Sequence, residues 1–298
     1  MVHGATVAKR ETIGVIGGSG LYEIEGLADV RRVAVDTPFG SPSDEYLVGT
    51  LGDVELAFLP RHGRGHRVAP HEINYRANLL GFKQLGAQSV VSISAVGSMK
   101  EDIRPGDLVL VDQFFDRTWG RASTFFGDGV VGHIPFADPV CARLHARLHD
   151  AARAAVAAAG TGARVHAAGT YLVINGPQFS TRAESRIFRS WGVDVIGMTN
   201  LPEARLAREA GLHYATVALA TDYDCWHDSE EDVSVQAVLA VLRQNVATAR
   251  DVVARAARAA MPAGACGCVD AVAHAVMTDA SLIAPAARAR LALILGSP

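Results

Sequence analysis

Residues 12–22 read TIGVIGGSGLY, an apolar run that passes directly into a glycine-rich turn. Near-continuous apolar runs that end in small or polar residues return at 54–60, 88–94, 107–114 and 213–221, with shorter ones near 165–174 and 193–196. Strands covered on both faces have this character. Stretches with helical spacing lie between them, among them 74–85, 139–159, 202–211 (PEARLAREAG) and 233–260. The sequence therefore predicts an α/β fold with a covered sheet.

Length and charge narrow the class of protein. The chain has 298 residues, 49% of them hydrophobic, and a formal net charge of −3. A chain this apolar can bury a full core, which excludes wholesale disorder. Its near-neutral charge argues against nucleic acid and anionic membranes as partners. We expect a flexible tail over 1–11, one large domain over 12–260 and a helical extension over 261–298.

The compartment is predicted from what the sequence lacks. The first residues show no secretory signal, and no apolar run reaches the length of a membrane span, so we expect a cytoplasmic protein. Four cysteines are too few and too scattered for a disulfide framework. They are Cys141, Cys225, Cys266 and Cys268. For the pair Cys266 and Cys268 we expect reduced, structural thiols, and a strained redox pair is the alternative.

Small and polar residues gather after the predicted strands, at the edge where open α/β sheets bind ligands. The run from Gly17 to Gly20 can present N–H groups and the Ser19 hydroxyl to an anion. A plain structural turn remains an alternative for this loop. A dinucleotide fingerprint is a weaker one, since the glycine spacing is incomplete.

Arg61 and His62 provide a second anion-binding signal, because arginine offers a planar fork of donors that matches phosphate oxygens. The positive charge of this loop suits one small anion, although a solvated basic loop is the alternative. A metal site at His62, His66 and His71 is disfavoured by the neighbouring arginines. Ser94 and Thr199 add hydroxyl groups after other strands, and the chain has no P-loop. Together these features favour free inorganic phosphate.

Asp222 and Asp224 follow the apolar strand 213–221. Two carboxylates in a sheet interior are costly unless they are paired or functional. Burial and mutual repulsion would raise the pKa of one of them and favour a general acid. An aspartate in this position can also read the edge of a heteroaromatic base. An ion pair with an arginine is the structural alternative.

Eight ordered motifs together resemble purine nucleoside phosphorylases of the trimeric type. They are GVIGGSGLY, DTPFGSPSD, LPRHGRGH, INYRANL, GDLVLVDQFFDRT, GPQFSTRAES, GMTNLPEARLAREAG and ATDYDCW, and the resemblance covers about residues 12–260. It implies a three-layer sandwich in which helices flank a mixed, partly barrel-like central sheet, with 12–260 as the nucleoside phosphorylase domain. It also implies a homotrimer or a dimer of trimers, no metal and no cofactor. Inorganic phosphate would be a co-substrate.

The resemblance also assigns site residues. Asp222 would face the purine nitrogen that is protonated as the base leaves, and Asp224 would lie near the exocyclic amine. Phosphate would be bound by Ser19, Arg61, His62, Ser94, Ala95 and Thr199. The nucleoside would be bound by Met198, Phe179, Ser180, His66, Val235 and Val238, with His133 from a neighbouring subunit and Ile283 from the C-terminal region.

Two sequence features indicate which substrate of this family the chain would bind. Asp222 and Asp224 can accept hydrogen bonds from a 6-amino group. Val235 and Val238 suit an apolar 5′ substituent and leave a 5′-hydroxyl poorly satisfied. We therefore expect phosphorolysis of methylthioadenosine to adenine and 5-methylthioribose-1-phosphate. The alternatives are a phosphorylase for adenosine or 6-oxopurine nucleosides and, from another class, a non-catalytic Rossmann-type nucleotide-binding module.

Overall fold

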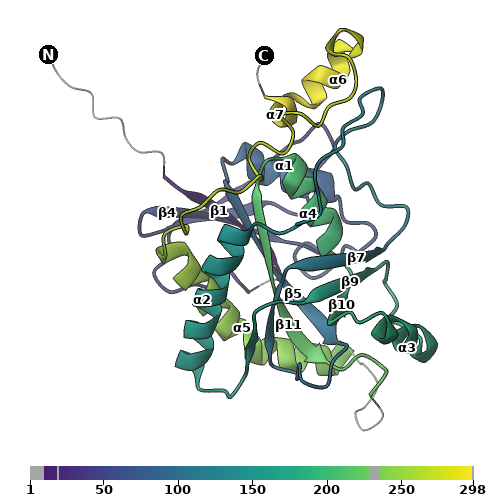
Figure 1. Ribbon diagram of the computed structural model, residues 1–298. Coiled ribbons are helices and arrows are strands. Elements are labelled where there is room, and N and C mark those ends of the chain that lie inside the picture. Colours follow the sequence, from purple (N-terminus) through teal and green to yellow (C-terminus); the bar gives the residue numbers. More distant parts are fainter. Residues whose placement is uncertain (1–9, 19, 228–234, 297–298) are drawn as a thin grey trace, which may run out of the picture.

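The computed structural model describes residues 10–18, 20–227 and 235–296, with the side chains of 235–240 and 242–244 excepted. In this part of the chain an 11-stranded mixed sheet lies between helices (Figure 1). The strands are β1 (Thr12–Gly17), β2 (Ala28–Val33), β3 (Tyr46–Leu51), β4 (Val54–Pro60), β5 (Ser89–Ser98), β6 (Leu108–Val111), β7 (Gln113–Arg117), β8 (Val165–His166), β9 (Thr170–Ile174), β10 (Val195–Gly197) and β11 (His213–Asp222). The helices are α1 (Tyr75–Gln84), α2 (Ala142–Ala159), α3 (Arg182–Ser190), α4 (Asn200–Glu209), α5 (Val235–Arg258), α6 (Pro285–Arg290) and α7 (Ala292–Leu295), with a 3₁₀ turn at Ala280–Leu282.

Strand β5 is the branch point of the sheet. One path runs β2-β3-β4-β1-β5-β10-β9-β7, and β11, β6 and β8 continue from the other edge of β5. The first half of β5 pairs in parallel with β1, its end pairs antiparallel with β10, and β11 runs parallel to almost its whole length. The predicted α/β fold with a mixed, helix-flanked sheet is confirmed, and the sheet is not closed into a barrel.

Strand β1 shows why the sheet is covered on both faces. Successive side chains of a strand point to opposite faces. Ile13 and Val15 pack into a core shared with α2 and α5, whereas Ile16 packs into a second core with α1 and α4. Gly14 brings α1 close to the sheet, since a Cβ there would lie 2.6 Å from Cδ1 of Phe82. These contacts build the three layers seen in Figure 1.

The parallel strands β1, β4, β5 and β11 bring their carboxyl ends to one edge. Four loops far apart in the sequence therefore meet there. They begin at Gly18, Arg61, Met99 and Tyr223. The topology places the predicted site segments together before any side chain is considered.

The C-terminal segment runs back over the molecule after α5. Residues 259–279 form turns, bends and irregular chain, joined to the body by a β-bridge between Gly132 and Val276. Leu291 and Ile294 of the last helices pack into the core that contains α1. Among the described residues, no helix is long and apolar enough to cross a membrane.

Candidate active site

A cavity of about 610 Å³ opens at the carboxyl edge of the parallel strands. Its volume lies within the range of small-molecule sites. Most of the predicted site residues line it. They lie on β5, at the end of β11, and in the segments after β4, β9, β10 and β11. The predicted residues in its wall are Arg61, His62, His66, Ser94, Ala95, Phe179, Ser180, Met198, Thr199, Asp222 and Asp224.

Five predicted residues are not found in the part of this wall that the structure describes. Ser19 lies outside the described residues, as do the side chains of Val235 and Val238 on α5. Ile283 does not reach the cavity of its own chain, because it is 8% exposed and packs into the core with α1. His133 does not line the cavity either, since its backbone binds the C-terminal segment. Its predicted role concerned a neighbouring subunit and stays a prediction.

Asp222 and Asp224 are held by hydrogen bonds and not by cations. The Thr221 hydroxyl donates to Oδ2 of Asp222 at 2.7 Å, and the Asp224 N–H donates to Oδ1 of Asp222 at 2.8 Å. The Ser185 hydroxyl, from α3, donates to Asp224. Neither carboxylate has an ion-pair partner in the part of the chain that the structure describes. The structural alternative of an arginine pair is therefore not supported.

The pKa values of both aspartates are raised. Burial is the main cause at Asp222, and it outweighs the hydrogen bonds that stabilise the charged form. Burial also raises the pKa of Asp224, to which the charge of Asp222 adds. The sequence predicted this rise for one of the pair, and the structure extends it to both. A carboxyl group that retains its proton more strongly can serve as a general acid.

The absence of a side chain at Gly97 of β5 leaves room for the Asp222 carboxylate. A Cβ on Gly97 would lie 2.9 Å from Oδ1 of Asp222 and 3.0 Å from Cγ2 of Ile196. Asp224 has a φ of 51°, in the left-handed region that few non-glycine residues adopt. Strained backbone of this kind is concentrated at functional sites.

Arg61 is buried in an ion pair, which corrects the expectation that its fork faces the anion. It is 3% exposed. Its Nε lies 2.5 Å from Oε1 of Glu203 and its Nη2 lies 3.2 Å from Oε2. Nη1 donates to the Ile93 carbonyl at 3.0 Å. Of the five guanidinium N–H groups, one on Nη1 has no partner among the described residues, so Arg61 can offer the cavity a single donor.

Glu203 is the residue that sequence reasoning missed. Burial alone would lower the pKa of Arg61, but the Glu203 carboxylate outweighs it and raises that pKa. Glu203 also accepts from the hydroxyls of Tyr214 at 2.9 Å and Ser92 at 3.2 Å. The available signal was an acidic residue in the first turn of the predicted helix PEARLAREAG.

The rest of the basic loop is also neutralised. Asp44 lies 2.9 Å from Nη2 of Arg64 and 3.7 Å from Nη2 of Arg67. Burial lowers the pKa of His62 to about 4, so its ring is neutral at pH 7. Its Nδ1 must carry the proton, because it lies 2.9 Å from the Val68 carbonyl. Nε2 is then an acceptor, suited to a protonated oxygen on an anion.

Hydroxyl groups supply much of the remaining polarity of the cavity. Ser94 Oγ lies 3.2 Å from the Tyr171 hydroxyl. Thr199 directly precedes α4 and makes no side-chain cap to it. The buried Ser180 Oγ has no hydrogen-bond partner among the described residues, which leaves it available to a ligand. The Met198 carbonyl accepts from Nη1 of Arg121 at 2.6 Å, which anchors the loop after β10.

Comparisons with known proteins agree with this geometry. A family model described as "Phosphorylase superfamily" matches residues 12–258. A protein of Geobacter sulfurreducens named S-methyl-5′-thioadenosine phosphorylase is 57% identical over 289 residues, covering 97% of this chain and 99% of that one. A protein of the same name from Koribacter versatilis is 53% identical and covers 95% of both chains.

Solved structures give the same result. A methylthioadenosine phosphorylase from an antarctic soil metagenomic library has a TM-score of 0.90 and 43% identity, covering 97% of this chain and all of that one. A methylthioadenosine phosphorylase from Schistosoma mansoni, in complex with adenine, has a TM-score of 0.77 and 44% identity, over 83% of this chain and 90% of that one. The match therefore extends over sequence and fold, and the chain belongs to the phosphorylase superfamily.

Proposed function

We propose that this chain catalyses the phosphorolysis of 5′-methylthioadenosine, a pentosyl transfer that yields adenine and 5-methylthioribose-1-phosphate and serves purine and methionine salvage. The observation that carries the proposal is the pair Asp222 and Asp224. They are half-buried and buried, respectively, with no cation paired to either among the described residues, in a cavity that also contains hydroxyl and N–H donors. Relatives named as phosphorylases of this substrate cover almost the whole chain, which supports the same conclusion.

Asp222 is assigned to the leaving base. Its raised pKa favours the protonated form, which can donate to a ring nitrogen as the base departs. Positioned general acids contribute about 10²–10⁴-fold to rate. Asp224 is assigned to the exocyclic amine as acceptor, which favours 6-aminopurines over 6-oxopurines. Phe179 and Ser180 complete the base site, and Ser180 contributes the unpartnered hydroxyl.

Phosphate is assigned to the opposite side of the cavity. Ser19, Ser94 and Thr199 contribute hydroxyl groups and Ala95 contributes backbone. Arg61 contributes one N–H, while His62 accepts from the protonated phosphate oxygen. These groups hold the anion aligned with the anomeric carbon, which removes much of the entropic barrier. Donors preorganised in a buried site need no rearrangement during the reaction.

The sugar is assigned to the space between these two parts. Met198 lies against the ribose, and His66, Val235 and Val238 surround the 5′-methylthio group. Apolar side chains there discriminate against a 5′-hydroxyl. We further propose a homotrimer or dimer of trimers in the cytoplasm, catalysis without metal or organic cofactor, and 12–260 as the catalytic domain. In that assembly His133 reaches the pocket of the neighbouring subunit.

A panel of nucleosides tests the proposal. The full chain is incubated with methylthioadenosine, adenosine or inosine, with and without phosphate, and base release is measured. We expect phosphate-dependent adenine release from methylthioadenosine and little action on inosine. Preference for inosine would contradict the 6-aminopurine assignment. Nucleotide binding without turnover of any nucleoside would favour a non-catalytic module.

A further inference from the structure

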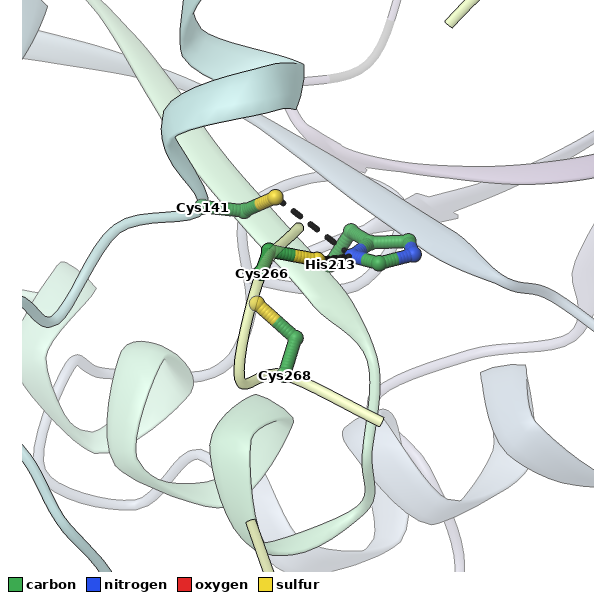
Figure 2. A group of neighbouring side chains, drawn as sticks. All are labelled: Cys141, His213, Cys266 and Cys268. Atoms are coloured by element: carbon green, nitrogen blue, oxygen red, sulfur yellow. Dashed lines mark hydrogen bonds between the residues drawn. The ribbon is translucent and has the colours of Figure 1, made fainter. Parts of the chain in front are cut away.

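Three thiols and one imidazole converge at the edge of the sheet opposite the active site (Figure 2). Cys141 directly precedes α2, His213 is the first residue of β11, and Cys266 and Cys268 lie in the segment after α5. Each offers one ligand atom, and these four atoms all lie within 4.8 Å of one another. Three separate parts of the chain thus bring a Cys₃His set together.

The distances in this cluster fit a tetrahedral metal site. Sγ of Cys141 and Sγ of Cys266 each lie 3.4 Å from Nδ1 of His213. A tetrahedral zinc ion, with Zn–S near 2.3 Å and Zn–N near 2.0 Å, separates sulfur and nitrogen by about 3.5 Å. The same ion separates two sulfur atoms by about 3.8 Å. An ion therefore fits between these atoms with little movement of the backbone.

Hydrogen bonding accounts poorly for the same arrangement. Nδ1 of a neutral imidazole offers either one lone pair or one proton, yet two thiols approach it at equal distance. Cys141 and Cys268 are buried, and all four cysteines of the chain are free. The grouping of these four ligand atoms is therefore better explained by coordination of a metal than by hydrogen bonds within the cluster.

The location of the cluster indicates a structural role. Strand β11 begins at His213 and ends at Asp222, so about 30 Å of strand separates the cluster from the catalytic carboxylates. Residues 259–279 have little regular structure of their own. Their other ties to the body include the bridge at Val276 and a 2.7 Å hydrogen bond from Nε of Arg143 to the Pro262 carbonyl. A metal here would fasten the C-terminal segment to α2 and β11.

We propose that Cys141, His213, Cys266 and Cys268 bind one structural Zn²⁺ ion that secures the C-terminal segment to the phosphorylase fold. Coordination replaces the thiol protons, which pass to solvent, and Nδ1 of His213 binds through its lone pair with the remaining ring proton on Nε2. Four protein ligands close the coordination sphere, as in structural zinc sites. The resemblance found in the sequence implied no metal. Sequence reasoning missed this set because its four ligands come from three distant segments.

Zinc content of the purified full chain tests the proposal. Wild-type protein, prepared without chelator, is expected to hold about one zinc per chain by elemental analysis. Cys268→Ser should reduce this at least about tenfold, since loss of one thiolate leaves an incomplete site. Cys225→Ser is the matched control and should retain the metal, because Cys225 lies beside Asp224 and outside the cluster.

Two further measurements do not depend on the folding of a variant. Cobalt added to wild-type protein freed of zinc should produce the absorption of a tetrahedral thiolate site. Removal of zinc by a chelator should increase proteolytic cleavage within 261–279 and leave the rest of the chain protected. A folded wild-type chain that binds neither zinc nor cobalt would overturn the proposal. An intact mass two hydrogens short, from a disulfide among these cysteines, would also overturn it.

Discussion

The Glu203→Gln substitution should destabilise the folded chain by about 3 kcal/mol, because removal of one partner from a buried ion pair leaves the other charge uncompensated. Glutamine conserves volume and one acceptor oxygen, and Arg61 keeps its bonds to the Ile93 carbonyl and to Ser92. The NH₂ group of the glutamine would point its donors at a guanidinium or a hydroxyl, which is the source of the cost. Because volume and one acceptor are conserved, this cost lies at the lower end of the 3–5 kcal/mol found for broken buried pairs.

Urea unfolding at a fixed protein concentration measures this change, because the stability of the proposed trimer would depend on concentration. With an unfolding entropy of about 2.1 cal/mol/K per residue, a loss of 3 kcal/mol lowers the Tm by about 5 °C. A loss below about 1 kcal/mol would refute the reasoning, because it would mean that the pair contributes no more than one neutral hydrogen bond.

Glu209→Gln is the matched control on the same helix. Its carboxylate accepts from the Phe125 N–H and the Thr124 hydroxyl, both at 2.7 Å, and no described arginine pairs with it. We expect a cost of about 1 kcal/mol, the scale of one hydrogen bond. The double variant Arg61→Met with Glu203→Leu should be more stable than Glu203→Gln, because it removes both buried charges.

Three further predictions concern activity. Asp222→Asn should lower kcat on methylthioadenosine at least about tenfold through loss of the proton donor, with stability at pH 7 unchanged or increased; unchanged kcat would exclude the role. Because burial raises the pKa of Asp222, kcat should fall as pH rises through that pKa. Any stability that its protonated form contributes is lost over the same pH range. A kcat that stays constant as pH rises would contradict this. Gly97→Ala should lower kcat about tenfold by displacing Asp222 and cost about 1–3 kcal/mol of stability; wild-type kinetics would show that the close approach is dispensable.

The elements predicted from the sequence were those with long, one-sided or fully buried apolar patterns. Strands β1, β4, β5 and β11 and helices α1, α2, α4 and α5 fall within a few residues of the expected ranges. Strand β2 was missed because it is an exposed edge strand, with the sequence ADVRRV. The single strand expected over 107–114 is broken at Asp112, whose N–H donates to the Gly169 carbonyl. The strand pairing changes there, since β6 pairs with β11 and β7 pairs with β9. Such a change does not alter the local pattern of hydrophobic residues.

The sequence by itself determined the class of fold, and it pointed to the strand ends and the two aspartates that line the candidate site, because apolar periodicity and small residues after strands are local signals. Only the tertiary structure decided which charges meet. Arg61 is paired with Glu203, and Cys141 is brought beside Cys268, because a buried charge or thiol is satisfied by whatever neighbour the packing places there. That neighbour is distant in sequence, so no local sequence pattern predicts it.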